Sequence, residues 1–170
     1  GFVKQSNTSS NVYGGEEPFS EAETSAIKAF VDSHENITIA FDYHSQGNVF
    51  FPAHKFRHEA EIDGTDMSVL CANMNDEFSK VTGRKYGIHR GKPPAALISG
   101  SGREYYYSRG IIAVVVEVGT KNIPDYMKSM SGSINENIPA LKYAFSEVIN
   151  YSSVAPKRVD EFTIQSVDAS

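Results

Sequence analysis

Two polar side chains stand where apolar runs of this sequence end. His44 follows the alternating stretch 37–43, and Glu117 is the only charged residue in GIIAVVVEVG. A histidine and a glutamate at neighbouring strand ends suit a metal ligand and a general base. On the residues alone a plainer alternative stays open: His44 ends its strand without binding anything, and Glu117 pairs with an arginine such as Arg103.

Two strands are expected to carry these side chains to one place. Residues 37–44 alternate between apolar and polar positions, which is typical of a half-buried strand. Residues 111–118 form the most β-branched run of the chain and predict a strand buried on both faces. We expect both strands to be central in their sheet. Ligands of open α/β sheets bind beyond the carboxyl ends of strands, so His44 and Glu117 can meet in one crevice.

The first two predicted helices have clear end signals. Ser20 and Glu23 have the spacing of a capping box and predict a helix over about 20–34. Its apolar positions recur at helical spacing and are Ala26, Ile27, Phe30 and Val31. Asp66 is expected to cap a second helix, which Gly83 ends in the left-handed conformation. The apolar face of this second helix is Met67, Leu70, Cys71, Met74, Phe78 and Val81.

The remaining segments complete an α/β pattern. Residues 45–64 are expected to be mostly loop, and AALIS is expected to be a short strand before the glycine step SGSGRE. A last helix over about 135–150 carries the apolar residues Ile138, Leu141, Phe145, Val148 and Ile149. Helices that alternate with buried strands predict an α/β fold, with three α/β/α layers around a mixed sheet. We expect one domain over 1–155 and a polar tail over 156–170.

Composition narrows the classes of protein that fit. The chain has 170 residues, a length that suits one domain with a substantial core. Its formal charge of −5, without any block of lysine and arginine among aromatics, argues against a nucleic-acid partner. No apolar run is long enough to be a membrane segment. The single cysteine, Cys71, falls on a predicted apolar helix face and is expected to be a core residue.

The order of several motifs resembles the zinc carboxypeptidase family. YGGEEPFSEAET precedes a predicted helix, DYHSQG ends the next predicted strand, and SGSGREYYYSRG leads into IIAVVVEVG. In that family a Tyr-Gly-Gly step likewise precedes a helix, one strand ends in His-Ser, and a later strand ends in a glutamate. The match covers residues 12 to about 150. The resemblance implies a zinc carboxypeptidase-like form of the layered α/β fold.

The resemblance also implies a zinc peptidase site. His44 matches a zinc ligand of the family, and Glu117 matches its general base, so zinc is the implied cofactor. The implied substrate is the C-terminal end of a peptide. His-Ser-Gln-Gly and Glu-Val-Gly are closer to bacterial members that cut peptidoglycan stem peptides, which implies a secreted or cell-envelope protein. The positions implied to bind substrate are Ser45, Arg103, Tyr105 and Tyr107.

Arg103 matches the family position that lines the pocket for the terminal side chain of the substrate. A guanidinium in such a pocket pairs with a carboxylate. The resemblance therefore implies a preference for an acidic or diamino-acid terminal residue, such as diaminopimelate. The alternative that Arg103 neutralises Glu104 or Glu117 stays open.

One part of the family pattern is not found in this sequence. The family takes two further zinc ligands from a His-x-x-Glu pair in an early loop, and no such pair precedes His44. Catalytic zinc usually takes about three protein ligands, so a single histidine cannot hold it. We expect the C-terminal half of a catalytic domain or a degenerate relative, inactive alone, with remaining ligands upstream of residue 1. Two alternatives are a non-catalytic peptide-binding module and a deacylase-type amidohydrolase.

Overall fold

A mixed four-stranded sheet forms the centre of the structure, a computed structural model that describes residues 2–3, 6–53, 66–89, 97–98 and 100–154. In sheet order its strands are β2 (Ile39–His44), β6 (Ile112–Glu117), β3 (Val49–Pro52) and β4 (Gly87–Ile88). β2 runs parallel to β6, β3 runs antiparallel to β6, and β4 runs parallel to β3. A separate parallel pair joins β1 (Phe2–Val3) to β5 (Leu97–Ile98).

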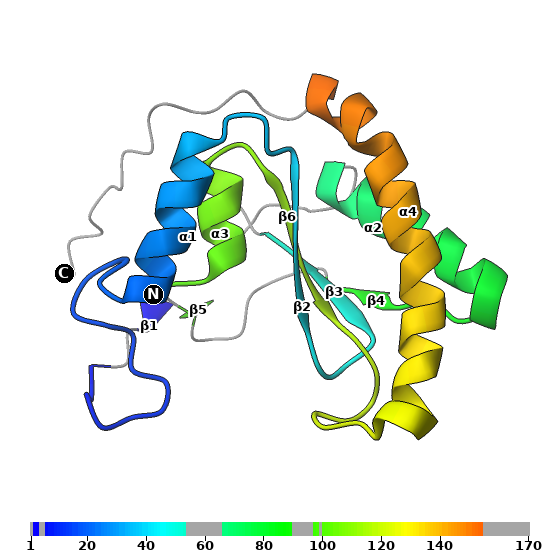
Figure 1. The fold of residues 1–170 in the computed structure, drawn as a ribbon, viewed down its shortest axis with the longest axis horizontal. Coiled ribbons are helices and arrows are strands. Elements are labelled where there is room, and N and C mark those ends of the chain that lie inside the picture. Colours follow the sequence, from blue (N-terminus) through cyan, green and yellow to red (C-terminus); the bar gives the residue numbers. More distant parts are fainter. Residues whose placement is uncertain (1, 4–5, 54–65, 90–96, 99, 155–170) are drawn as a thin grey trace.

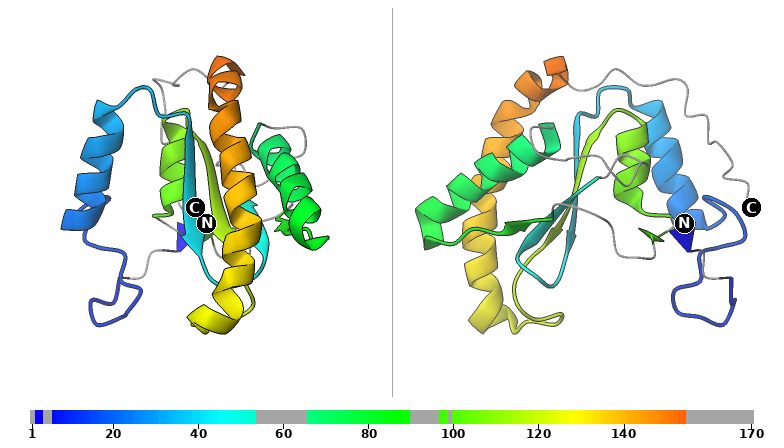
Figure 2. Two further views of the ribbon diagram at one scale, coloured as in Figure 1. Left: turned by 45° about the vertical axis from the view of Figure 1, so that its right-hand side comes forward. Right: turned by 180° about the vertical axis from the view of Figure 1, so that it is seen from behind.

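Helices cover both faces of the four-stranded sheet (Figure 1). On one side lie α1 (Ala22–Ser33) and α3 (Gly102–Ser108). On the other side lie α2 (Asp66–Thr82), η1 (Tyr126–Met130) and α4 (Ser131–Val154), and the turned views in Figure 2 keep the two groups apart. The predicted three-layer α/β/α fold is confirmed. Among the described residues, no helix is both long enough and apolar enough to cross a membrane.

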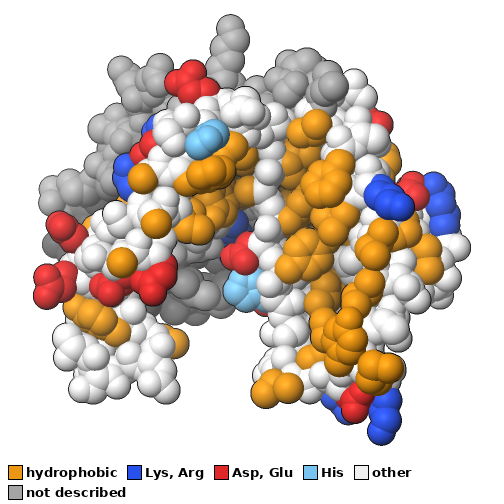
Figure 3. Space-filling model, viewed as in Figure 1, with side chains coloured by type: hydrophobic (Ala, Val, Ile, Leu, Met, Phe, Trp, Pro, Cys, Tyr) orange, Lys and Arg blue, Asp and Glu red, His pale blue; other side chains and the backbone are white. Residues whose placement is uncertain are grey.

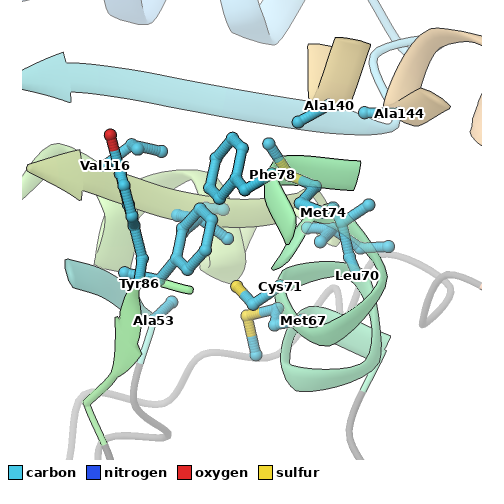
Figure 4. Packing of buried hydrophobic residues seen from close by; sticks show 14 residues of the cluster. Ala53, Met67, Leu70, Cys71, Met74, Phe78, Tyr86, Val116, Ala140 and Ala144 are labelled. Carbon is cyan, nitrogen blue, oxygen red and sulfur yellow. The ribbon is translucent and has the colours of Figure 1, made fainter. Parts of the chain in front are cut away.

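β6 supplies the middle of the core, as its β-branched sequence predicts. Its even-numbered side chains are buried against α2 and α4, and they are Ile112, Val114 and Val116. Phe78 of α2 packs against two other rings, with centroids 5.7 Å from Phe50 and 4.5 Å from Tyr86, and Figure 4 shows the contact with Tyr86. Cys71 is fully buried in the same cluster, which confirms the prediction that it is a core residue.

The start of α1 differs from the predicted capping box. The helix begins at Ala22 after Glu21, and no side chain caps its first turn. The Ser20 hydroxyl donates instead to Glu21 Oε1 at 3.0 Å. Since Glu21 holds the N-cap position, Ser20 lies one residue before the cap, and the predicted capping box is wrong.

α2 follows its predicted pattern closely. It begins at Asp66, and Gly83 after its end has a φ of 71°, in the left-handed region. The predicted face is buried at Met67, Leu70, Cys71, Met74 and Phe78. Val81 departs from the prediction, with 47% of its surface exposed, because it lies in the last turn of the helix.

α4 is longer than the predicted last helix and buries a different face. It begins at Ser131, directly after η1, and contains Pro139. Its fully buried or nearly buried side chains are Glu136, Asn137, Ala140 and Ala144. Ile138 and Phe145 were predicted to face the core, yet they are 45% and 67% exposed. The two small alanines let α4 approach α2 and the sheet closely, and this orientation turns the larger apolar side chains outward.

Several elements were not predicted from the sequence. β3 lies within the segment 45–64, which was expected to be mostly loop, and β4 lies within GRKYGIHRGKPP. α3 occupies the glycine step, where a loop was expected. β2 lies at the edge of the described sheet rather than at its centre, because among the described residues only β6 pairs with it. The predicted tail over 156–170 lies outside the described residues.

Candidate functional site

His44 and Glu117 end adjacent parallel strands at the same level. They are register partners, His44 on β2 and Glu117 on β6. Partners in a ladder point to the same face of the sheet. Val116, the neighbour of Glu117, points into the core with α2 and α4, so His44 and Glu117 project from the opposite face, which α1 and α3 cover. The structure thus places these two residues at adjacent strand ends on one face of the sheet, and their shared role in a site stays a prediction.

Hydrogen bonds fasten the loops that follow the two strands. The Val118 amide donates to the His44 carbonyl oxygen at 2.9 Å, which extends the ladder past the strand ends. The Gly47 amide donates to the carbonyl oxygen of Gly119 at 3.0 Å. The Gly119 amide donates in turn to the side-chain oxygen of Asn48 at 2.8 Å. The ends of β2 and β6 are therefore held together beyond the last strand residues.

The loop after His44 approaches Glu117 closely at a glycine. A Cβ built on Gly47 would lie 3.4 Å from Glu117 Cβ and 3.0 Å from Val49 Cγ1, so a larger residue would crowd both side chains. Ser45 was predicted to bind substrate. Its exposed hydroxyl donates to the Asn122 carbonyl oxygen at 2.9 Å, which ties this loop to the segment after β6.

One oxygen of the Glu117 carboxylate has no hydrogen-bond partner in the described part of the chain. This atom, Oε2, is buried. Leaving a buried carboxylate oxygen without a partner is costly, since such groups normally accept hydrogen bonds or face a cation. An orphaned acceptor beside His44 fits a carboxylate that receives a proton or a hydrogen bond from a bound molecule. The described residues do not pair Glu117 with an arginine.

Asp42 joins the site, and the sequence analysis did not identify it. His44 Nε2 lies 3.0 Å from Asp42 Oδ1. Asp42 precedes His44 by two positions on β2, so the strand places both on one face. That period-two spacing was a signal that could have found this residue, because an aspartate is unusual inside a strand.

Arg103 pairs with Glu104, which is the alternative to substrate binding that the sequence left open. Its Nε lies 2.9 Å from Glu104 Oε1, so the guanidinium neutralises the adjacent carboxylate. Its Nη1 donates to the Phe51 carbonyl oxygen at 3.5 Å, and the guanidinium lies 5.8 Å from the centroid of the Phe51 ring. α3 thereby places Arg103 against β3, on the same side of the sheet as His44.

Tyr105 and Tyr107, both predicted to bind substrate, are engaged within the fold. The Tyr105 hydroxyl donates to Asp32 Oδ1 on α1 at 3.0 Å. Burial, assisted by the hydrogen bond to Asp32, raises the pKa of Tyr105 to about 12. Tyr107 packs against the core, and its pKa is raised by burial and then by the charge of Glu104. The described contacts thus make Tyr105 a link between α1 and α3.

Behind the sheet, a buried polar network reaches the residue next to His44. The Tyr43 hydroxyl donates to Asn137 Oδ1 at 3.2 Å, and Asn137 Nδ2 donates to the Tyr86 hydroxyl at 3.1 Å. Tyr86 donates to Glu136 Oε1 at 2.7 Å, and Arg84 Nη2 donates to Glu136 Oε2 at 2.7 Å. Since neighbouring strand residues face opposite ways, this network anchors β2 from the side that His44 does not use.

The described residues fit part of a zinc site. His44 can supply one nitrogen ligand, and Glu117 beside it can act as a base. No group of three or more His, Cys, Asp and Glu side chains in the described ranges is arranged to hold a metal ion. A catalytic zinc site needs about three protein ligands, so the remaining ligands would have to come from outside these ranges.

The fold defines a class of protein, a three-layer α/β/α domain, and His44 and Glu117 form a polar pair at its strand ends. The sequence profile of the family described as "Zinc carboxypeptidase" matches residues 1–138. The chain belongs to the zinc carboxypeptidase family. Mouse Carboxypeptidase A4 is 25% identical over 105 residues, which are 62% of this chain and 25% of that protein.

Solved structures share the fold at low sequence identity. Thrombin activatable fibrinolysis inhibitor superposes with a TM-score of 0.73 at 18% identity, over 86% of this chain and 40% of that one. The bovine protein, solved in complex with tick carboxypeptidase inhibitor, gives 0.74 at 19% identity, over 86% of this chain and 52% of that one. Carboxypeptidase A from Helicoverpa armigera gives 0.57 at 18% identity, over 91% and 39% of the respective chains. This chain therefore spans about half or less of each of these proteins.

Proposed function

We propose that this chain is part of a zinc metallocarboxypeptidase-like domain that hydrolyses peptide bonds at the C-terminal ends of peptides. The observation that carries the proposal is the register of His44 with Glu117 at the ends of two parallel strands. Family membership supports zinc and peptide hydrolysis as the chemistry. In this proposal residues 1–155 are the C-terminal part of the catalytic domain, and 156–170 form a tail.

In this proposal His44 binds zinc and Glu117 transfers protons. His44 would provide one ligand, and zinc would supply a Lewis acid that polarises the scissile carbonyl and lowers the pKa of water. Glu117 takes a proton from the attacking water and passes it to the nitrogen of the leaving amine. Its buried, unpartnered Oε2 is the atom suited to accept that proton. Gly47 leaves the space beside Glu117 free of a side chain.

We further propose that the remaining zinc ligands come from polypeptide beyond the described residues, placed along the outer edge of β2. The Thr38 carbonyl oxygen accepts from the Ile112 amide of β6 at 2.9 Å, and the His44 carbonyl oxygen accepts from the Val118 amide, just after β6, at 2.9 Å. In a parallel ladder bonding alternates along the strand, so the backbone groups of 39, 41 and 43 point away from β6. This edge supports the addition of another strand.

A helix of each layer also carries exposed apolar side chains. Ile27 and Phe30 of α1 are 49% and 57% exposed, and Ile138 and Phe145 of α4 are 45% and 67% exposed. Figure 3 shows hydrophobic side chains gathered along α4. Exposed apolar patches of this kind mark surfaces that another part of a protein covers. Polypeptide added to β2 would bury them and bring its own ligands to His44.

The finer choice of substrate is also a proposal. A peptidoglycan stem peptide, and with it a secreted or cell-envelope location, rests on the His-Ser-Gln-Gly step and on Arg103. Because Arg103 pairs with Glu104, a substrate carboxylate would have to displace or share that partner. Substrates that end in Glu, Lys, Phe and diaminopimelate should be compared with wild-type and Arg103→Ala full-length protein. An unchanged order of preference would show that Arg103 does not select the terminal residue.

The proposal is tested by hydrolysis with the full-length gene product. We expect release of the last amino acid from a peptide with a free C-terminal carboxylate, and no release from its amidated counterpart. Glu117→Gln should reduce the rate by at least about a hundredfold, because general-base catalysis typically contributes that much. Hydrolysis that is unaffected by Glu117→Gln would contradict the assigned role.

A non-catalytic peptide-binding module is the second candidate. It is favoured by the lack of any three-residue metal group among the described residues. This candidate predicts that full-length protein binds the free C-terminal end of a peptide without cleaving it, and that added zinc does not change the affinity. Cleavage of the same peptide would exclude it.

A further inference from the structure

We propose that Asp42 is a positioning residue for His44, which holds the imidazole with its proton on Nε2 and leaves Nδ1 for a metal ion. The contact that carries this inference is the 3.0 Å separation of Asp42 Oδ1 and His44 Nε2. Only the metal-binding role of Nδ1 rests on the proposed function. The orientation and tautomer of the ring rest on this contact alone.

The chemistry of the two groups decides which ring nitrogen carries the proton. An ionised carboxylate can only accept hydrogen bonds, and a neutral imidazole has a single N–H. At 3.0 Å from Asp42 Oδ1, Nε2 must therefore be the donor. The lone pair then lies on Nδ1, and a neutral ring nitrogen with a free lone pair is the form of histidine that binds metal ions.

Asp42 lies two residues before His44 on β2, further from the strand end. Asp42 has Val115 as its register partner, whereas His44 is opposite Glu117 at the strand end. The charge of Asp42 also helps to raise the pKa of Tyr106 on α3, although burial is the larger cause. Asp42 thus lies two positions before the strand end on the face that carries His44, while Glu117 is the register partner of His44.

A carboxylate in this place orients a ligand histidine and increases its basicity, and such partners typically change metal affinity by about 10–100-fold. The competing explanation is an ordinary exposed ion pair, since the two side chains are 51% and 47% exposed. Exposed pairs contribute little to stability. The two explanations differ in what they affect: a positioning residue determines the tautomer of His44, whereas an ordinary surface pair leaves it unchanged.

The test is nitrogen NMR of the histidine rings in this 170-residue chain, without any metal. Long-range proton–nitrogen spectra at about pH 8.5, where imidazole rings are neutral, distinguish the two tautomers. The His44→Gln spectrum assigns the signals of His44. Asp42→Ala removes the acceptor, and Asp42→Thr repeats the removal with a residue that favours strands. Asp76→Ala is the matched control, because Asp76 forms an exposed pair with Lys85 at 2.8 Å.

We expect the wild-type His44 ring to carry its proton on Nε2. Loss of one hydrogen bond should lower the ratio of Nε2–H to Nδ1–H by about three- to tenfold in both Asp42 variants. Asp76→Ala should leave the ratio unchanged, and Asp42→Glu should restore part of it. A His44 proton on Nδ1 in the wild type, or an unchanged ratio in Asp42→Ala and Asp42→Thr, overturns the inference. Because no metal or peptide is present, this result is independent of whether full-length protein is a zinc peptidase.

Discussion

Glu136 is the buried charge on which the polar network behind the site depends, and its replacement tests the packing of α4. Its side chain is fully buried. Oε1 accepts from the Tyr86 hydroxyl at 2.7 Å, and Oε2 accepts from Arg84 Nη2 at 2.7 Å and from Thr82 Oγ1 at 3.3 Å. Glu136→Ala removes every one of these acceptors. The network then retains only the bonds among Tyr86, Asn137 and Tyr43.

The expected loss of stability comes from the hydrogen-bond donors that Glu136→Ala leaves without an acceptor. Tyr86 is 3% exposed, so an unpaired hydroxyl donor there costs about 1–3 kcal/mol. The Arg84 side chain is 44% exposed and water can solvate it, so its share is small. Loss of the one buried methylene group, Cγ, adds about 1 kcal/mol. We expect Glu136→Ala to lower the free energy of unfolding by about 2–4 kcal/mol, a large part of a typical total of about 5–15 kcal/mol.

Urea unfolding followed by circular dichroism measures this loss. Glu136→Gln keeps the size of the side chain and an acceptor for Tyr86, so it should cost about half as much as Glu136→Ala. Glu77→Gln is the control, because Glu77 pairs with Lys80, whose side chain is 67% exposed, and such pairs contribute below about 1 kcal/mol. If Glu136→Ala unfolds within about 1 kcal/mol of wild type, the network does not hold α4 against the sheet.

Three further changes test other parts of the structure. Gly119 has a φ of 72°, so Gly119→Ala should cost about 1–2 kcal/mol in urea unfolding, and an unchanged midpoint would contradict the fastening of this loop. Tyr105→Phe removes the hydrogen bond to Asp32 and should cost about 1 kcal/mol; equal stability would show that this bond does not join α1 to α3. The Lys28 hydrogen bond, opposed by burial and assisted by Tyr105 and Arg109, holds the pKa of Asp32 below 3.8. This stabilisation is present above the unfolded-state pKa and is lost as pH falls through the lower folded-state pKa. The stability difference between wild type and Asp32→Asn should therefore shrink between about pH 5 and pH 2. A difference that stays constant over that range would contradict the pairing.

The strongest patterns in the sequence were also the most reliable. The β-branched run at 111–118 became the internal strand β6, and α2 buried nearly all of its predicted face. His44 and Glu117 could be brought together from sequence because both follow long apolar runs and parallel strands end at the same edge. These features are local, or depend on one simple rule of sheet geometry.

The features that sequence reasoning missed depend on tertiary contacts or on short elements. α3 has only 7 residues, and its three consecutive tyrosines carry no helical periodicity. The face of α4 was assigned to its largest apolar residues, whereas packing selected Ala140 and Ala144. Asp42 was overlooked because its contact with His44 depends on side-chain direction rather than on composition.

The most direct test of the central claim separates metal binding from proton transfer in the full-length gene product. Zinc content per chain and release of a C-terminal amino acid should be measured for wild type, His44→Ala and Glu117→Gln. We expect about one zinc per chain and hydrolysis in wild type, loss of both in His44→Ala, and retained zinc without hydrolysis in Glu117→Gln. Undiminished zinc in His44→Ala, or full hydrolysis in Glu117→Gln, would contradict the central claim.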